Sequence, residues 1–267
     1  MKISVIIPTY KPKEYLWECL DSLKGQTLSK DLFEVILVLN GCFEPWKSQI
    51  ESYIIHNMQG VNMNFVHTPQ GGVSNARNIA LDVAKGDYVT FIDDDDYVSS
   101  RFLEGLYEKA AKDTIVLCYP YGFYDGKPEV QVQDYSVTIQ YEKLAMKGKM
   151  FYTKARKFFS GPCMKLIPMS YIHDRRYNPQ FKNGEDSLFM FLISDQFRFV
   201  DFAGKDIRYY RRYRKNSAFT APRKISSKIY NTISVIQEYC IIYFKNPSAY
   251  NLTFFLTRII GALHSIL

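Results

Sequence analysis

Short apolar runs alternate with amphipathic segments along the first hundred residues. Four runs of aliphatic and β-branched side chains each predict a buried strand, at 3–7, 34–39, 64–68 and 88–92. Two segments between them, 12–25 and 74–86, place apolar side chains at helical spacing, with Ser74 as the expected N-cap of the second. Strands that alternate with helices predict an α/β fold in which helices flank a mostly parallel sheet.

Polar and glycine residues follow each predicted strand directly. They are Pro8-Thr9-Tyr10, Asn40, Gly71-Gly72 and the four aspartates 93–96. In parallel sheets, ligands bind outside the carboxyl ends of the strands. We therefore expect these residues to line one crevice.

The pattern is looser beyond residue 117. Residues 126–141 alternate with period two, which predicts an antiparallel or edge strand, and 185–193 read as a helix. Long helical stretches begin at 225 and are interrupted at 245–251. We expect one α/β domain over 1–220 and a C-terminal helical segment over 221–267.

Composition narrows the class of protein. The 267 residues are 47% hydrophobic and 23% charged, which is typical of a globular domain. Five dispersed cysteines and four dispersed histidines favour neither a disulfide framework nor a zinc site. A strand-like run at the N-terminus leaves no room for a signal peptide, so we expect a cytoplasmic protein. The net charge of +7 favours anionic partners: nucleotides, nucleic acid or an acidic membrane surface.

The four aspartates suit a metal. On an extended segment Asp93 and Asp95 would face one way and Asp94 and Asp96 the other. Two carboxylates on one side fit Mg²⁺ or Mn²⁺, which keep positions for water and phosphate oxygens. An EF-hand fits poorly, because Val98 stands where its glycine is required. A solvated acidic turn is the alternative.

Three stretches, "SVIIPTYKPKEYLWECLDSLKGQT", "GGVSNARNIALDVAKGDYVTFIDDDD" and "NGEDSLFMFLI", appear in that order. Together they resemble the nucleotide-sugar glycosyltransferases of family 2, with the GT-A fold, over residues 3–217. The resemblance implies an inverting transferase in bacterial-type surface polysaccharide synthesis, with Mn²⁺ or Mg²⁺ as cofactor. Its donor would be a nucleotide sugar, with UDP favoured, and its acceptor a glycan or lipid-linked oligosaccharide. Residues from about 1 to 100 would bind the nucleotide and about 101–220 the acceptor.

The resemblance also implies roles for the donor side. Pro8, Thr9 and Tyr10 would line the pocket for the nucleobase and ribose, and Arg77 would lie near the nucleotide. The alternatives are a packing aromatic for Tyr10 and a surface helix arginine for Arg77.

The aspartates would share the donor and its metal. Asp93 and Asp94 would contact the nucleotide sugar, with Asp93 also near the metal, and Asp95 would bind the metal directly. The family usually has Asp-Asp-Gly-Ser after the second strand, whereas this chain has Asn40-Gly41. Asn40 could hydrogen-bond to uracil or thymine, or simply form a turn.

The family pattern assigns Asp186 as general base and places Glu185 against the acceptor. A carboxylate can take the proton of a sugar hydroxyl as the new bond forms. The alternative is that both merely complement the dipole of a helix N-terminus.

The basic run 208–217 is the segment most open to another interpretation. In the family reading Arg211, Arg214 and Ser217 belong to a mobile loop over the diphosphate. Binding of single-stranded nucleic acid is the alternative, but no nucleic-acid-binding fold signature accompanies the run, so we expect no nucleic acid. A sugar-nucleotide binding protein without catalysis also stays open.

The C-terminal helices are apolar but interrupted by polar residues, which argues against a membrane span. Three roles fit them: packing on the domain, forming a homodimer interface, or lying on an anionic membrane surface.

Overall fold

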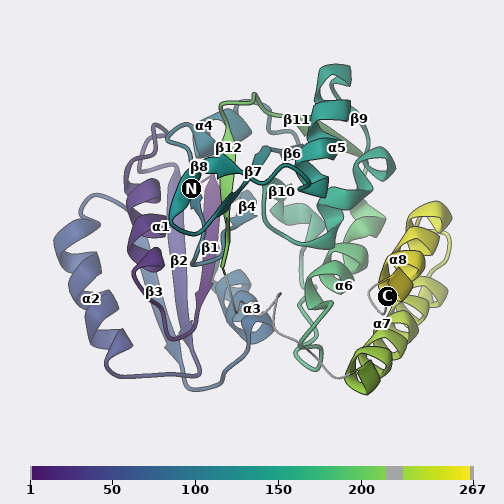
Figure 1. Cartoon of the computed structure of the whole chain (residues 1–267), viewed down its shortest axis with the longest axis horizontal. Coiled ribbons are helices and arrows are strands. Elements are labelled where there is room, and N and C mark those ends of the chain that lie inside the picture. Colours follow the sequence, from purple (N-terminus) through teal and green to yellow (C-terminus); the bar gives the residue numbers. More distant parts are fainter. Residues whose placement is uncertain (1, 215–224, 265–267) are drawn as a thin grey trace.

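The computed structural model describes residues 2–214 and 225–264. Its centre is an eight-stranded sheet in the order β3-β2-β1-β4-β10-β6-β11-β9 (Figure 1). The bounds along this order are Met63–Thr68, Phe33–Asn40, Ile3–Thr9, Tyr88–Phe91, Lys165–Pro168, Thr114–Leu117, Phe199–Phe202 and Met150–Phe151. The first four strands are parallel, β10 is antiparallel to β4 and β6, and β9 is antiparallel to β11. The predicted α/β class and the four predicted strands are confirmed.

Helices cover both faces of this sheet. The α-helices of the described chain are α1 (Tyr15–Lys24), α2 (Trp46–Asn57), α3 (Val73–Val83), α4 (Phe102–Tyr107), α5 (Ser136–Leu144), α6 (Glu185–Leu192), α7 (Ile225–Lys245) and α8 (Leu252–His264), and the last two pack beside α6 rather than on the sheet. Alternate side chains of β1 enter different cores: Ile6 packs with Ala76 of α3, whereas Val5 packs with Leu16 and Leu20 of α1. Burial on both faces explains why these strands are continuously apolar.

A second, four-stranded sheet has the order β5-β12-β7-β8, with bounds Tyr97–Val98, Arg208–Tyr213, Tyr119–Tyr124 and Lys127–Gln131. Two predictions are corrected here. The predicted antiparallel edge strand is present but covers only β8, and residues from Ser136 onward form α5, where Thr138 and Tyr141 are buried on one helical face. Most of the predicted mobile loop is β12, paired with β5 and β7, while Ser217 lies outside the described residues.

The start of α3 also differs from the prediction. Its N-cap is Gly72, with φ of 124°, and Ser74 lies buried inside the first turn. The early glycine lets the loop after β3 turn sharply into the helix.

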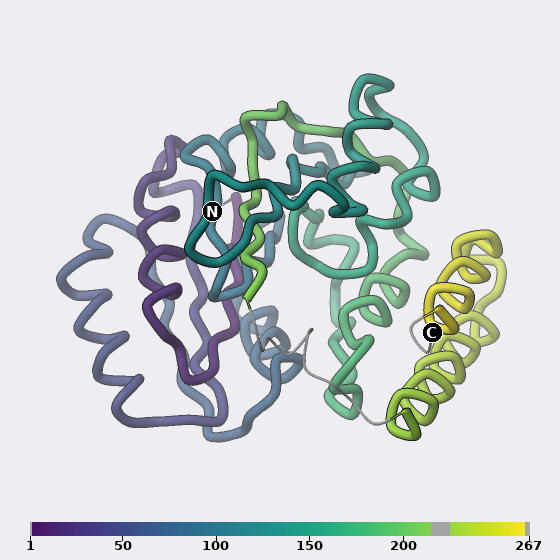
Figure 2. Tube along the Cα trace, in the orientation of Figure 1, coloured from purple at the N-terminus to yellow at the C-terminus, as the bar shows by residue number. Residues whose placement is uncertain are grey.

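The C-terminal helices pack on the domain. In the trace of Figure 2 they form a hairpin at one end of the molecule, beside α6. The ring of Phe191 in α6 lies 5.2 Å from that of Tyr239 in α7 and 6.0 Å from that of Phe254 in α8. Helices α7 and α8 therefore share the core of the α/β domain, while the expected boundary near 220 falls outside the described residues. Among the helices of the described chain, none is long and apolar enough to cross a membrane.

Candidate active site

The ends of β1, β2, β3 and β4 meet at one edge of the sheet. Thr9 at the end of β1 donates a hydrogen bond to Asp94 after β4. Asn40 at the end of β2 donates to the carbonyl of Thr9 (2.7 Å) and accepts from the amide of Gly72 after β3 (2.8 Å). A Cβ on Gly41 would lie only 2.7 Å from the Cα of Gly71, so these two loops touch through their glycines. The four strand ends form one site, as the sequence predicts.

Asn40 and Tyr10 behave differently in this site. Asn40 is buried, and both ends of its amide bond to the protein backbone. Asn40 therefore joins two loops of the protein. This role differs from the expectation that Asn40 hydrogen-bonds to a nucleobase. Tyr10 is 54% exposed, so its ring is not a packing aromatic and is available to a ligand.

The four aspartates lie on a turn, since the amide of Asp96 donates to the carbonyl of Asp93 (3.0 Å). The predicted alternation along an extended segment is therefore wrong. Each carboxylate has its own partner: Asp93 pairs with Arg77, Asp94 with Thr9, Asp95 with Arg214, and Asp96 with Tyr209 and the amide of Arg212.

Burial dominates the electrostatics of the turn. It raises the pKa of Asp94 to about 7, and the neighbouring charges of Asp95 and Asp93 add to the rise. Burial and the charge of Asp93 also raise the pKa of Asp95. Burial raises the pKa of Asp96 well above its usual range, and that side chain is only 4% exposed. Because Asp93 is 46% exposed and Asp95 is 19% exposed, the acidic turn is only partly solvated.

Arg77 of α3 is a buried bridge between two carboxylates. Its Nη1 lies 2.6 Å from Asp186 and its Nη2 lies 3.1 Å from Asp93. Its guanidinium also stands 5.4 Å from the centre of the Tyr177 ring. Burial alone would lower the pKa of Arg77, but the neighbouring groups, with Asp186 first and Tyr177 and Asp93 after it, together raise that pKa well above the ordinary value. Arg77 is thus no surface helix arginine, and it ties the end of β4 to the start of α6.

Glu185 and Asp186 open α6 directly after Gly184, which has φ of 84°. Neither side chain caps the helix. Burial, followed by the charge of Asp186, raises the pKa of Glu185 to about 7. Burial also raises the pKa of Asp186, while Arg77 opposes the rise. Asp186 is thus a partly buried carboxylate, 29% exposed, that pairs with Arg77 in addition to standing at the helix N-terminus.

Strand β12 brings cations to the acidic turn. Arg214 pairs with Asp95, and Arg212 donates to the carbonyl of Asp95 (2.9 Å) and pairs with Glu18 and Asp125. Arg211 donates to the hydroxyl of Tyr135 (3.2 Å). Arg211 and Arg212 belong to β12 rather than to the expected loop, whereas Arg214 lies one residue beyond that strand.

Sequence reasoning missed two buried residues of the site. The hydroxyl of Tyr209 accepts from the amide of Asp93 (3.1 Å) and donates to Asp96 (2.8 Å). The ammonium of Lys165, 1% exposed, donates to the carbonyls of Gly161 (2.6 Å) and Cys163 (2.5 Å), and burial lowers its pKa to about 8. The basic–aromatic pattern marked the run that contains Tyr209, but no local signal marks Lys165.

The donor set of the turn suits a divalent metal only in part. Across residues 2–214 and 225–264, no three His, Cys, Asp or Glu side chains are placed to hold a metal together. Asp95 and Asp93, which are 19% and 46% exposed, nevertheless repel each other, and a cation near them would relieve that repulsion. Hard cations such as Mg²⁺ accept few protein carboxylates together with water and phosphate oxygens. The residues thus fit a metal whose other ligands come from a diphosphate.

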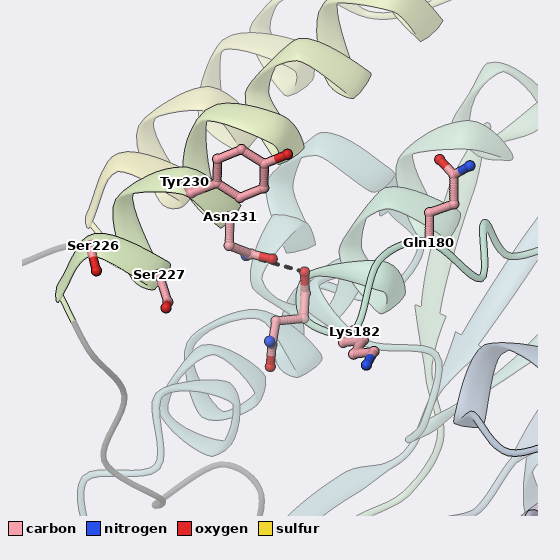
Figure 3. Close-up of a pocket in the computed structure, with 7 residues that line it drawn as sticks. Gln180, Lys182, Ser226, Ser227, Tyr230 and Asn231 are labelled. Carbon is pink, nitrogen blue, oxygen red and sulfur yellow. Dashed lines mark hydrogen bonds between the residues drawn. The ribbon is translucent and has the colours of Figure 1, made fainter.

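A depression of about 440 Å³ adjoins the start of α6 (Figure 3). The loop 180–183 forms one wall, and the first turns of α7 form the other. Asn231 of α7 reaches the carbonyl of Asn183 (3.4 Å) across it. Its lining is mainly amide, hydroxyl and ammonium groups, which suits a polar molecule.

Known proteins share this fold. In the crystal structure of residues 1–349 of Staphylococcus aureus TarS in complex with UDP-GlcNAc, 66% of that chain aligns with 90% of this one, with a TM-score of 0.70 and 23% identity. This likeness confirms the expected GT-A fold.

Sequence relatives agree with the fold. The uncharacterized glycosyltransferase EpsJ of Bacillus subtilis is 38% identical over 124 residues, which are 46% of this chain and 34% of EpsJ. A GalNAc(5)-diNAcBac-PP-undecaprenol β-1,3-glucosyltransferase of Campylobacter jejuni is 27% identical over 86% of this chain and 71% of that protein. The chain thus spans about a third of EpsJ. Residues 4–176 match glycosyl transferase family 2, and because this is more than half of the chain, the protein belongs to that family.

Proposed function

We propose that this protein is an inverting glycosyltransferase that moves a sugar from a UDP-sugar to a glycan or lipid-linked acceptor. The observation that carries the proposal is the bridge of Arg77, which holds Asp93 and Asp186 on its two terminal nitrogens. Asp93 belongs to the strand ends expected to bind the donor, and Asp186 is the expected base. The UDP-GlcNAc bound by TarS and the undecaprenol-linked saccharide in the name of the C. jejuni relative support the two substrate classes.

The donor lies against the strand ends. Tyr10 offers its exposed ring to the base, and Pro8 and Thr9 flank it on β1. Arg211 and Arg214 add positive charge on the side of the diphosphate. Asp95, with Asp93 beside it, would hold Mn²⁺ or Mg²⁺, which would supply positive charge for the departing nucleoside diphosphate.

Asp186 acts as the general base. It accepts the proton of the acceptor hydroxyl while that oxygen bonds to the anomeric carbon and the bond to the diphosphate breaks. Arg77 fixes the carboxylate of Asp186 and opposes the burial that raises its pKa. A single displacement of this kind inverts the anomeric configuration, so an α-linked donor gives a β-glycoside.

The acceptor approaches from the side of α6. Glu185 is placed to bind its hydroxyl groups, and the polar depression beside loop 180–183 offers room for a further sugar unit (Figure 3). The cytoplasmic location of the protein stays a prediction. Binding of RNA loses support, because Arg212 and Arg214 of the basic run are paired with carboxylates.

The Asp186→Asn variant tests the proposal. The amide is nearly isosteric but cannot take a proton, so turnover of the accepted UDP-sugar should fall roughly 10²–10⁴-fold while UDP binding by calorimetry stays nearly constant. Asp195→Asn is a matched control, because Asp195 also pairs with a single arginine at 2.6 Å but lies outside the site. Turnover of Asp186→Asn within a few-fold of the parent would remove Asp186 from this role. Binding without hydrolysis of any donor in a panel of nucleotide sugars would instead indicate a silent binding protein.

A further inference from the structure

The C-terminal hairpin buries only one side of each helix. In α7 the buried residues are Thr232, Val235 and Tyr239, and in α8 they are Phe254, Phe255 and Arg258. Residues in a helix advance by about 100° each, so positions two before or after these point to the opposite side. That opposite side faces away from the core shared with α6.

The outward side of the hairpin is apolar. Of the 19 large hydrophobic side chains exposed in the described chain, ten lie on these two helices. On α8 they recur at helical spacing: Leu252, Leu256, Ile260 and Leu263. On α7 they include Ile229, Ile233, Ile241 and Phe244. Apolar side chains that recur on one side of a helix in this way, unlike scattered single residues, mark an interaction surface.

A strongly basic segment packs against the inward side of α8. Residues 143–157 contain six lysines and arginines and no acid. Arg258 of α8 donates to the carbonyls of Arg156 (2.8 Å) and Phe159 (3.1 Å), so the segment lies against the hairpin. Within the described chain, Lys149 is the one cation of the segment with an ion pair. Met146, 93% exposed, adds an apolar tip among these charges.

We propose that the outward side of α7 and α8 and the basic segment 143–157 together dock the protein on an anionic lipid bilayer. Apolar side chains of surface-lying helices enter the boundary between headgroups and acyl chains, while lysines and arginines contact anionic headgroups. This docking goes beyond sugar transfer, because it requires neither donor nor metal.

Charge distinguishes the bilayer from a second copy of the chain. A dimer interface that included both the hairpin and the basic segment would bring like charges of the two copies together. Like charges at an interface repel, whereas an anionic surface neutralises them. An apolar hairpin side combined with a neighbouring cationic segment therefore fits lipid.

Vesicle flotation tests the docking. We expect the full-length protein to float with vesicles of phosphatidylglycerol and phosphatidylcholine, and to bind pure phosphatidylcholine at least about tenfold more weakly. The Ile241→Ser/Leu256→Ser double variant should lower the partition coefficient at least about tenfold. Its control is Ile55→Ser/Val130→Ser, which removes side chains of similar exposure (64% and 43%, against 63% and 49%) from α2 and β8, and should bind as the parent does.

A charge variant tests the basic segment separately. Lys154→Glu/Lys157→Glu should weaken binding to the anionic vesicles roughly fivefold or more per lysine. Circular dichroism and thermal melting check that each variant is folded, and UDP binding checks the donor site independently of lipid. Equal flotation of parent and both hairpin and charge variants would overturn the proposal. So would a dimer in light scattering that Ile241→Ser/Leu256→Ser converts to monomers without any vesicle binding by the parent.

Discussion

Replacing Arg77 by methionine should destabilise the fold strongly above neutral pH. The side chain of Arg77 is 3% exposed and serves Asp186, which is 29% exposed, and Asp93, which is 46% exposed. Removing one partner of a buried ion pair costs about 3–5 kcal/mol, because the remaining charge is left uncompensated. Because Asp93 is partly exposed, water screens its charge. We therefore expect the free energy of unfolding to fall by about 3 kcal/mol, mainly from the loss of the pair with Asp186. With a urea m-value of about 2–3 kcal/mol/M, the midpoint of unfolding should fall by about 1–1.5 M.

The loss should depend on pH. Arg77 opposes the burial that raises the pKa of Asp186, so without Arg77 that pKa rises further. In the variant, Asp186 can then bind a proton and become neutral. The difference in unfolding free energy between variant and parent should therefore shrink as the pH falls from 8 to 5. Arg176→Met is the matched control, since it breaks an exposed pair with Asp82 and should cost well under 1 kcal/mol. A midpoint shift below about 0.3 M, or one equal at both pH values, would refute the bridge.

Two further predictions concern the carboxylates. Asp95→Ala should stay folded but lose the rise in melting temperature that UDP and Mn²⁺ produce together, because it removes the proposed metal ligand; a parent-like response would place the metal elsewhere. Glu185→Gln should raise the melting temperature at pH 8 but not at pH 4.5. The raised pKa of Glu185 means that its ionisation costs folded-state stability as the pH rises from 4.5 to about 7. An equal effect at both pH values would contradict that pKa.

The hydrophobic pattern along the sequence predicted those elements of the fold that depend mainly on neighbouring residues. The strands of the nucleotide half are continuous apolar runs because helices cover both faces, and this signal needs no knowledge of distant residues. The pattern failed where burial is partial. In α5 a short alternating sequence also placed Thr138 and Tyr141 at helical spacing, and tertiary packing selected the helix.

The sequence predicted which residues belong to the candidate site better than it predicted the contacts between them. The strand ends and motifs indicated which residues gather, and they do gather. The hydrogen-bond partners of Asn40, Arg77 and Asp96 lie 16 to 116 residues away in the sequence, so the adjacent residues do not indicate them. Lys165 carries no local signal at all, because its role is to bond two backbone carbonyls in a place closed off by the fold.

The anchoring of the acidic turn by Tyr209 has a consequence for the order of folding. The hydroxyl of Tyr209 bonds to Asp93 and Asp96 across 116 and 113 residues of chain, and β12 also pairs with β5 just after the turn. Until β12 arrives, four neighbouring carboxylates have no arginine of that strand beside them. Closing so long a loop is entropically costly and slow compared with forming the local β–α units. The site should therefore take shape among the last events of folding, after the sheet that carries it has formed.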